Sequence, residues 1–134
     1  MRRRREAGQS LVETALVLPV LLIILMGIFD FGRAIFAYNA VSNSAREAVR
    51  VAIVNQNTTA VEDEAKRSAI GLDPTEIDVT FDIPDCATVL VGCTAQVTVD
   101  NEWAAITPII GNLIGPIQLS STTEMKVERA FSSP

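Results

Sequence analysis

The stretch that decides the fold runs from Gly8 to Phe36 and reads GQSLVETALVLPVLLIILMGIFDFGRAIF. Its centre, residues 14–29, contains no charged side chain and is dominated by Leu, Val and Ile. A helix rises about 1.5 Å per residue, so this centre covers about 24 Å of a hydrocarbon core that is ~30 Å thick. We therefore expect a membrane-spanning helix that also uses the flanks, from about residue 11 to residue 36. Pro19 removes one helical hydrogen bond and should bend this helix near its start.

The charge in front of the apolar stretch predicts its orientation. Residues 2–5 are all Arg, and only Glu6 opposes them. Positively charged flanks stay on the cytoplasmic side, so we expect a cytoplasmic N-terminus and an extracytoplasmic C-terminal part. A cleaved secretory signal peptide would need small residues soon after the apolar run, and Arg33 with its aromatic neighbours spoils the nearest match. We therefore interpret the stretch as a permanent single-span anchor in the lipid bilayer.

Composition limits what the rest of the chain can do. The chain has 134 residues and a net charge of −5, and its first eight residues carry four Arg and one Glu, which leaves −8 for the remainder. An acidic external domain is a poor candidate for binding nucleic acid, which needs a basic face. The sequence contains no His, which excludes a His-based catalytic triad and a His-ligated metal site. Residues 55–134 form a small domain that would gain stability from a disulfide or from partners.

The helix is expected to continue beyond the membrane to about Val54. Apolar side chains recur there at three- and four-residue steps, a pattern typical of an amphipathic helix; they are Phe31, Ala34, Ile35, Tyr38, Val41, Ala45, Ala48, Val49 and Ala52. Residues 37–54 should therefore form an extracytoplasmic half that carries the domain. Because this stripe is rich in Ala, it can pack closely against a sheet or another helix.

The remaining sequence predicts a small α+β domain. Residues 55–59 favour a turn, and a second helix over residues 60–70 is expected with Thr59 as its cap and Gly71 at its end. Alternating apolar residues predict strands over residues 77–83, 94–102 and 117–129. Their short connections favour an antiparallel sheet, so we expect a long helix packed on three or four strands. The apolar connection over residues 107–116 either closes over the sheet or faces a partner.

Two cysteines fall in the connection between the first two strands. Cys86 and Cys93 lie on the oxidising side of the membrane by the orientation argument, which predicts a disulfide between them. Their spacing excludes a CxxC redox motif, and a metal site would have too few soft ligands. Asp78 and Asp82 are expected on the solvated face of a strand. We find no motif for catalysis, a metal or a cofactor, and therefore predict that the chain is not an enzyme.

The segment around Gly8 suggests a processing site. A short basic leader, residues 1–8, ends in Gly8, and Glu13 follows five residues later inside the apolar segment. This arrangement resembles the cleavage site of type IV pilins and pseudopilins, in which a prepilin peptidase cuts after the Gly. The resemblance implies cleavage between Gly8 and Gln9, and pairing of Glu13 with the free α-amino group of a neighbouring subunit. Alternatively, Glu13 is an interfacial residue favoured by the helix dipole.

A narrower resemblance covers residues 8–54. The runs Gly8-Gln9-Ser10-Leu11-Val12-Glu13, Leu18-Pro19-Val20-Leu21-Leu22, Gly27-Ile28-Phe29-Asp30-Phe31-Gly32-Arg33 and Asn43-Ser44-Ala45-Arg46-Glu47-Ala48-Val49-Arg50 are similar to the TadE-like family. This family comprises minor pseudopilins of the Tad (Flp) pilus assembly machinery.

The resemblance implies a pilin-like lollipop in the bacterial cytoplasmic (inner) membrane, incorporated in a pilus or priming its assembly. The implied partners are a prepilin peptidase, the inner-membrane assembly platform, and other pilins or pseudopilins. Many type IV pilins have a methylated Phe at the first mature position, whereas this chain has Gln9.

Asp30 and Arg33 leave two interpretations open. They lie three residues apart on one helical face and can pair there as a charged collar at the outer interface, or they can contact a neighbouring helix. The function also has an alternative from another class. An uncleaved, signal-anchored binding module would keep its Arg-rich leader and use a patch such as residues 103–114, and a membrane-anchored enzyme is the third reading.

Overall fold

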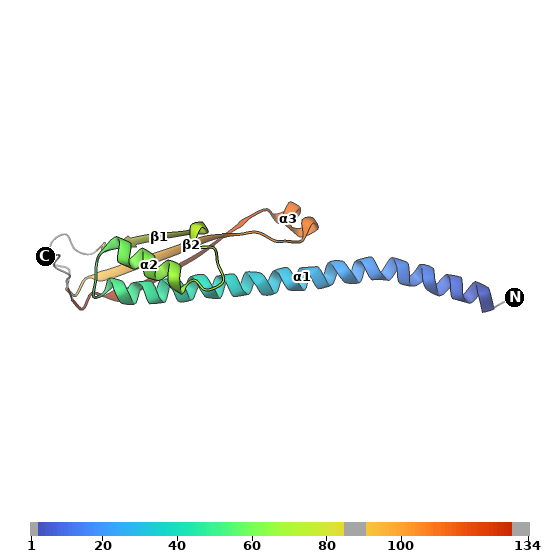
Figure 1. Ribbon diagram of the computed structural model, residues 1–134, viewed down its shortest axis with the longest axis horizontal. Coiled ribbons are helices and arrows are strands. Elements are labelled where there is room, and N and C mark those ends of the chain that lie inside the picture. Colours follow the sequence, from blue (N-terminus) through green and yellow to red (C-terminus); the bar gives the residue numbers. More distant parts are fainter. Residues whose placement is uncertain (1–2, 85–90, 130–134) are drawn as a thin grey trace.

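A computed structural model describes residues 3–84 and 91–129, and it shows a long helix with a small domain beside its C-terminal half (Figure 1). The elements are, in order, α1 (Arg3–Ala52), α2 (Thr58–Ser68), the short 3₁₀ helix η1 (Pro74–Glu76), β1 (Ile77–Asp82), β2 (Thr94–Trp103), α3 (Pro108–Ile114) and β3 (Ile117–Lys126). The three strands form one antiparallel sheet in the order β1-β2-β3. The predicted α+β class and the helix-on-sheet arrangement are confirmed.

Helix α1 is a single element of 50 residues, which corresponds to about 75 Å. It continues through Pro19 and curves in its N-terminal half, where the sequence predicted a bend (Figure 1). The helix ends at Ala52, two residues before the predicted end. It begins at Arg3 rather than near Ser10, so the helical conformation already includes the predicted processing site.

The turn after α1 is organised by Asn57. Its side-chain oxygen Oδ1 accepts hydrogen bonds from the backbone N–H groups of Thr59 at 2.9 Å and Ala60 at 3.4 Å. Asn57 is therefore the cap in place of Thr59, and α2 begins at Thr58, two residues before its predicted start. An Asn in extended conformation satisfies two helical donors at once, which favours it over the following threonines as the cap. Gly71 has a φ of 83°, and it turns the chain after α2 has ended at Ser68.

The sheet follows the alternation of its sequence. The side chains of Ala95, Val97 and Val99 in β2 are buried as predicted, and Val97 lies opposite Phe81 of β1 and Thr123 of β3. Asp78 and Asp82 are exposed, as expected for the other face of β1. The sheet therefore has one face for the core and one for solvent.

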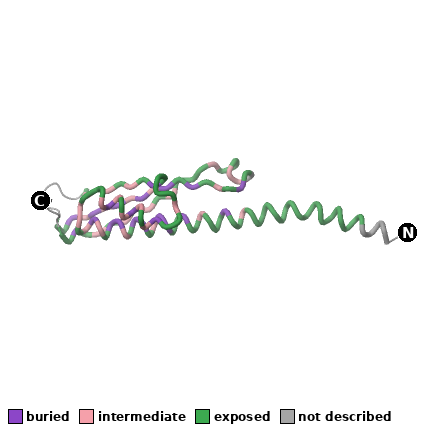
Figure 2. Tube along the Cα trace, viewed as in Figure 1, coloured by how far each residue is buried: buried purple, intermediate pink, exposed green. Residues whose placement is uncertain are grey.

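The core lies between the sheet, α1 and α2. Helix α1 contributes small and β-branched residues that are fully buried, namely Val41, Ala45, Ala48, Val49 and Ala52. The Ser44 hydroxyl donates a 2.6 Å hydrogen bond to the backbone oxygen of Ala65 and joins α1 to α2. Burial along α1 is concentrated in the half that carries the domain, whereas the N-terminal half is exposed (Figure 2). The predicted amphipathic stripe is therefore the core face of the domain.

The connection between β2 and β3 does not close over the sheet, which was one of the two predicted arrangements. It contains α3 and extends beyond the sheet alongside α1 (Figure 1). A Cβ atom built on Gly27 would lie 3.5 Å from Cδ1 of Ile110, so α3 approaches the apolar part of α1. We refer to residues 104–116 as the hairpin tip. Its position brings the domain into contact with the segment predicted to span the membrane.

Candidate functional site

The predicted processing site lies on an exposed part of α1. Gly8, Gln9 and Glu13 are all exposed helical residues. A Cβ atom added to Gly8 would have no neighbour within 4 Å, so packing among the described residues gives no reason for glycine at this position. Glycine in a helix interior is less favourable than alanine by about 1 kcal/mol. Its presence here therefore calls for an explanation other than the stability of this fold.

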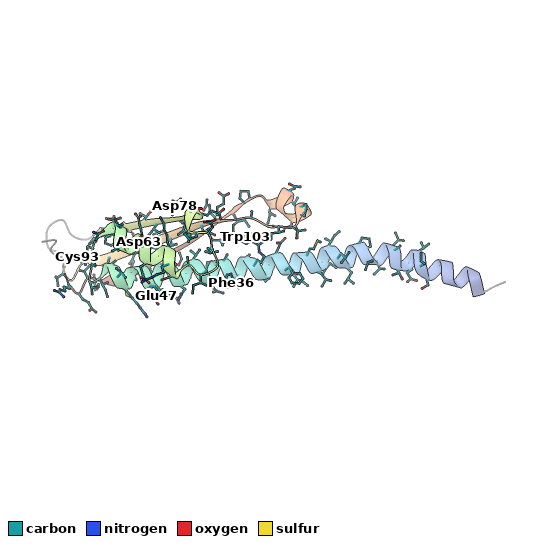
Figure 3. All side chains as sticks on the ribbon, viewed as in Figure 1. Phe36, Glu47, Asp63, Asp78, Cys93 and Trp103 are labelled. Atoms are coloured by element: carbon teal, nitrogen blue, oxygen red, sulfur yellow. The ribbon has the colours of Figure 1, made fainter. Side chains whose placement is uncertain are left out.

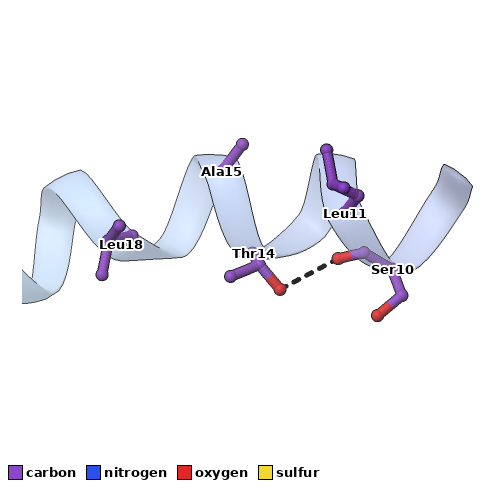
Figure 4. A pocket seen from close by; sticks show the side chains of 5 residues that line it. All are labelled: Ser10, Leu11, Thr14, Ala15 and Leu18. Carbon is purple, nitrogen blue, oxygen red and sulfur yellow. Dashed lines mark hydrogen bonds between the residues drawn. The ribbon is translucent and has the colours of Figure 1, made fainter. Parts of the chain in front are cut away.

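Glu13 carries the one charge between Ser10 and Leu18. Its neighbours line a shallow, mostly apolar depression along the helix, formed by Ser10, Leu11, Thr14, Ala15 and Leu18 (Figure 4). The hydroxyl of Thr14 donates a 2.9 Å hydrogen bond to the backbone oxygen of Ser10, so this polar group is satisfied within the helix. The ion pairs found among the described residues do not involve Glu13. Its carboxylate is thus available to a cationic partner from outside the chain.

The carboxylate of Asp30 joins α1 to the hairpin tip. Oδ1 accepts the backbone N–H of Ile106 at 3.1 Å, and Oδ2 accepts the backbone N–H of Thr107 at 3.0 Å. Asp30 is only 4% exposed, although its neighbours Phe29 and Phe31 on the same helix are largely exposed. A carboxylate that accepts two backbone donors forms charge-assisted hydrogen bonds, which are stronger than neutral ones. Asp30 therefore fixes the start of α3 against α1.

Arg33 contributes less to this arrangement. Its guanidinium nitrogen Nη1 lies 3.7 Å from Oδ1 of Asp30, and its side chain is 49% exposed. A partly exposed ion pair at this distance adds little stability. The sequence suggested that these two residues can pair, but it gave no sign of the backbone donors, which lie more than 70 residues further along the chain.

A cleft of about 380 Å³ opens between α1 and the hairpin tip. Gly27, Asp30, Phe31 and Ala34 line one side, and Trp103, Ile110, Ile114 and Ile117 line the other. Trp103 is the last residue of β2 and lies at the end of the strand that leads into the hairpin tip (Figure 3). Its indole nitrogen Nε1 is buried and has no hydrogen-bond partner among the described residues. A buried indole N–H normally finds an acceptor, so the cleft lacks a polar partner at this point.

The predicted site residues do not form one site. Glu13 and Asp30 are 17 positions apart on α1, which corresponds to about 26 Å. Cys93 is buried at the opposite end of the domain (Figure 3), and Cys86 lies outside the described residues, so the disulfide stays a prediction. Within the described ranges, no three metal-ligating side chains of His, Cys, Asp or Glu come together. The features that stand out are the N-terminal segment and the Asp30 junction.

Comparison with known proteins supports the resemblance seen in the sequence. The model of the TadE-like protein family matches residues 8–50, from the predicted processing glycine almost to the end of α1. The searches of curated proteins and of solved structures returned no match. The matched segment lies within α1, the one helix in the described part of the chain that is long and apolar enough to cross a membrane. These findings indicate a component related to the Tad pilus, with a helix compatible with a single-pass anchor.

Proposed function

We propose that this chain is a TadE-like minor pseudopilin, a structural and non-enzymatic component of Tad (Flp) pilus assembly. The observation that carries the proposal is the pair Gly8 and Glu13. Both lie on the exposed start of α1, within the segment that matches the family, and neither has a structural role among the described residues. A glycine without a packing reason and a carboxylate without a partner are both explained by processing and assembly.

The proposed mechanism begins with hydrolysis of the peptide bond between Gly8 and Gln9 by a prepilin peptidase. This step releases the basic leader, residues 1–8, and gives Gln9 a new α-amino group. A carboxylate at the edge of the lipid is costly unless it is paired, and the new amino group of a neighbouring subunit would neutralise Glu13. Such pairing would set the axial stagger between adjacent helices, which then pack through their exposed apolar surfaces.

The remaining chain divides into an anchor and a domain in this proposal. Residues 9–54 contain the long helix, which spans the cytoplasmic membrane over residues 11–36 and continues outside it to Ala52. Residues 55–134 form the extracytoplasmic domain, and Asp30 with Arg33 lies at the outer interface. The proposed partners are the peptidase, the inner-membrane assembly platform, and other pilins or pseudopilins.

The first test is the intact mass and N-terminus of the full chain, expressed with and without a cognate prepilin peptidase. We expect a chain that starts at Gln9 only when the peptidase is present, and no cleavage of Gly8→Leu. Gly32→Leu is the matched control, because a Cβ at Gly32 also meets nothing within 4 Å. A wild-type chain that keeps residues 2–5 beside an active peptidase would contradict the mechanism and leave the uncleaved binding module as the better account.

The second test separates Glu13 from processing. Glu13→Ala should still be cleaved and should still insert in the membrane, but it should fail to support pilus assembly because the new amino group has no partner. Thr14→Val is the matched control, since it changes a neighbouring polar residue whose hydroxyl bonds only within the helix. Normal piliation in the Glu13→Ala strain would show that the carboxylate does not set the register.

A further inference from the structure

The hairpin tip is an uncharged and largely exposed apolar surface. No Asp, Glu, Lys or Arg occurs between Trp103 and Thr123. Ile106, Leu113 and Ile114 are exposed, and Leu113 is the most exposed of them at 83%. Exposed apolar side chains gathered on one short segment mark a surface that meets either lipid or another protein.

The position of the tip favours lipid. Ile110 lies level with Gly27 of α1, six positions before Arg33, and six residues of helix correspond to about 9 Å. The tip therefore reaches below the level of Arg33, alongside a part of α1 whose side chains are themselves exposed and apolar, such as Ile28 and Phe29. The exposed surface of the tip is thus continuous with that of the proposed membrane span.

Several backbone N–H groups of the tip already have acceptors within the protein. Backbone N–H groups in lipid must be satisfied by the protein itself. Asp30 accepts the N–H groups of Ile106 and Thr107, and Pro108 has no N–H to satisfy. The N–H of Gly111 bonds to the Thr107 oxygen at 2.8 Å, and the N–H of Gly115 bonds to the Gly111 oxygen at 2.9 Å. An exposed aqueous loop would not need a buried carboxylate for two of its donors.

The burial of Trp103, which lines the cleft, is an independent observation. The residue is only 8% exposed, and its indole N–H lacks an acceptor among the described residues. Tryptophan is enriched at the membrane interface, where its ring lies among apolar groups and its N–H meets polar ones. The cleft beside this residue is lined by Phe31, Ala34 and Ile114, which are apolar side chains that a lipid acyl chain can contact.

We propose that the hairpin tip inserts into the outer leaflet of the membrane beside α1, with a lipid acyl chain in the cleft between the tip and the helix. The domain then contacts the membrane twice, once through α1 and once through α3. This inference rests on the anchored orientation in the proposed function, and the experiment distinguishes failure of the anchor from failure of the tip.

The experiment uses tryptophan fluorescence of the full chain in phosphatidylcholine–phosphatidylglycerol vesicles that contain brominated acyl chains. Trp103 is the only tryptophan, so the wild-type protein reports its own depth. In a Trp103→Phe background, Leu113→Trp reports the tip and Phe29→Trp reports the anchor at a similar level. Val91→Trp is the aqueous control, because Val91 is exposed and lies two residues before Cys93, which Figure 3 places at the opposite end of the domain. Circular dichroism checks that each variant folds.

We expect bromine in the acyl chain to remove most of the emission of Phe29→Trp and Leu113→Trp and none of that of Val91→Trp. Wild-type Trp103 should be quenched more by bromine near the glycerol than by bromine near the chain end. Quenching of Phe29→Trp without quenching of Leu113→Trp would overturn the inference and leave the anchor intact. An unquenched Phe29→Trp would overturn both. Blue-shifted but unquenched emission of Leu113→Trp, dependent on the protein-to-lipid ratio, would assign the tip to a second protein instead.

Discussion

At the scale of single residues, Asp30 connects two parts of the chain that the sequence does not relate. Its position in an apolar helix identified it as unusual, and its spacing from Arg33 suggested an ion pair. The structure contains this ion pair at 3.7 Å, but both carboxylate oxygens also accept hydrogen bonds from the backbone of Ile106 and Thr107. A hydrogen bond to a backbone N–H leaves no trace in the side chains of the donor residues, which explains why this contact was not predictable.

Asp30→Ala should release the hairpin tip from α1. Without the carboxylate, the N–H groups of Ile106 and Thr107 lose their acceptors, so their hydrogen exchange with solvent should become faster while the sheet keeps its protection. Hydrogen–deuterium exchange of the full chain in detergent micelles measures this. Arg33→Ala is the control and should change little, because its ion pair with Asp30 is long and half exposed. Unchanged exchange at both amides would show that the Asp30 contact does not hold the tip.

Asp73 gives a prediction about pH. Its carboxylate accepts the backbone N–H of Thr75 at 2.9 Å and the Thr75 hydroxyl at 2.7 Å, and these bonds lower the pKa of Asp73. A folded-state pKa below the unfolded value means that the contribution to stability is present above the unfolded pKa. It is lost as the pH falls through the folded pKa.

The midpoint of urea unfolding should therefore fall on acidification through the range in which Asp73 titrates, and Asp73→Asn should reduce this part of the dependence. Asp78→Asn is the control, because Asp78 is exposed and forms none of the side-chain hydrogen bonds found among the described residues. Equal effects of the two substitutions would contradict a special role of Asp73.

At the scale of elements, the periodicity of apolar residues predicted which faces of the helix and of the strands are buried. The apolar stripe over Val41 to Ala52 and the alternation over β2 identified the two faces that form the core, because each face repeats within its own element. Boundaries were shifted where one side chain decided the outcome, as at Asn57. The hairpin tip was outside the reach of such reasoning, since its course depends on contacts with α1 rather than on its own pattern.

The alanines of α1 set how closely the helix approaches the sheet. Ala48 is fully buried, so Ala48→Leu inserts volume into a packed interface and should lower the free energy of unfolding by about 1–3 kcal/mol. Urea unfolding followed by circular dichroism measures the change. Arg46→Leu, on the exposed side of the same helix, should stay within about 0.5 kcal/mol of the wild type. Equal stability of both variants would mean that the Ala48 face is not tightly packed.

At the scale of the whole molecule, α1 has two environments. From about residue 37 onward it packs under the domain, and over residues 8–29 it is exposed apart from the half-buried Gly27. The charge of the chain is divided in the same way, since the four arginines precede the apolar segment and the acidic residues dominate after it. The molecule therefore combines an exposed apolar helix with a folded acidic domain.

This division predicts the topology in cells. Protease added to spheroplasts should degrade the domain, because a basic N-terminal flank keeps the start of α1 in the cytoplasm. In inverted membrane vesicles the domain should be protected, and solubilising those vesicles with detergent should restore cleavage. Degradation of the domain in inverted vesicles without detergent would reverse the orientation and with it the proposed route to the pilus.

The contact between the hairpin tip and α1 also has a consequence for geometry. The buried face of α1 over Val41–Ala52 already fixes how the sheet is rotated about the helix. Asp30 adds a second attachment, because it ties the far end of the hairpin to α1 well away from the main core. The sheet therefore has one fixed orientation around the axis of α1. Identical subunits built in this way would present the same face in the same direction, so that a helical lattice could be specified before any two of them meet.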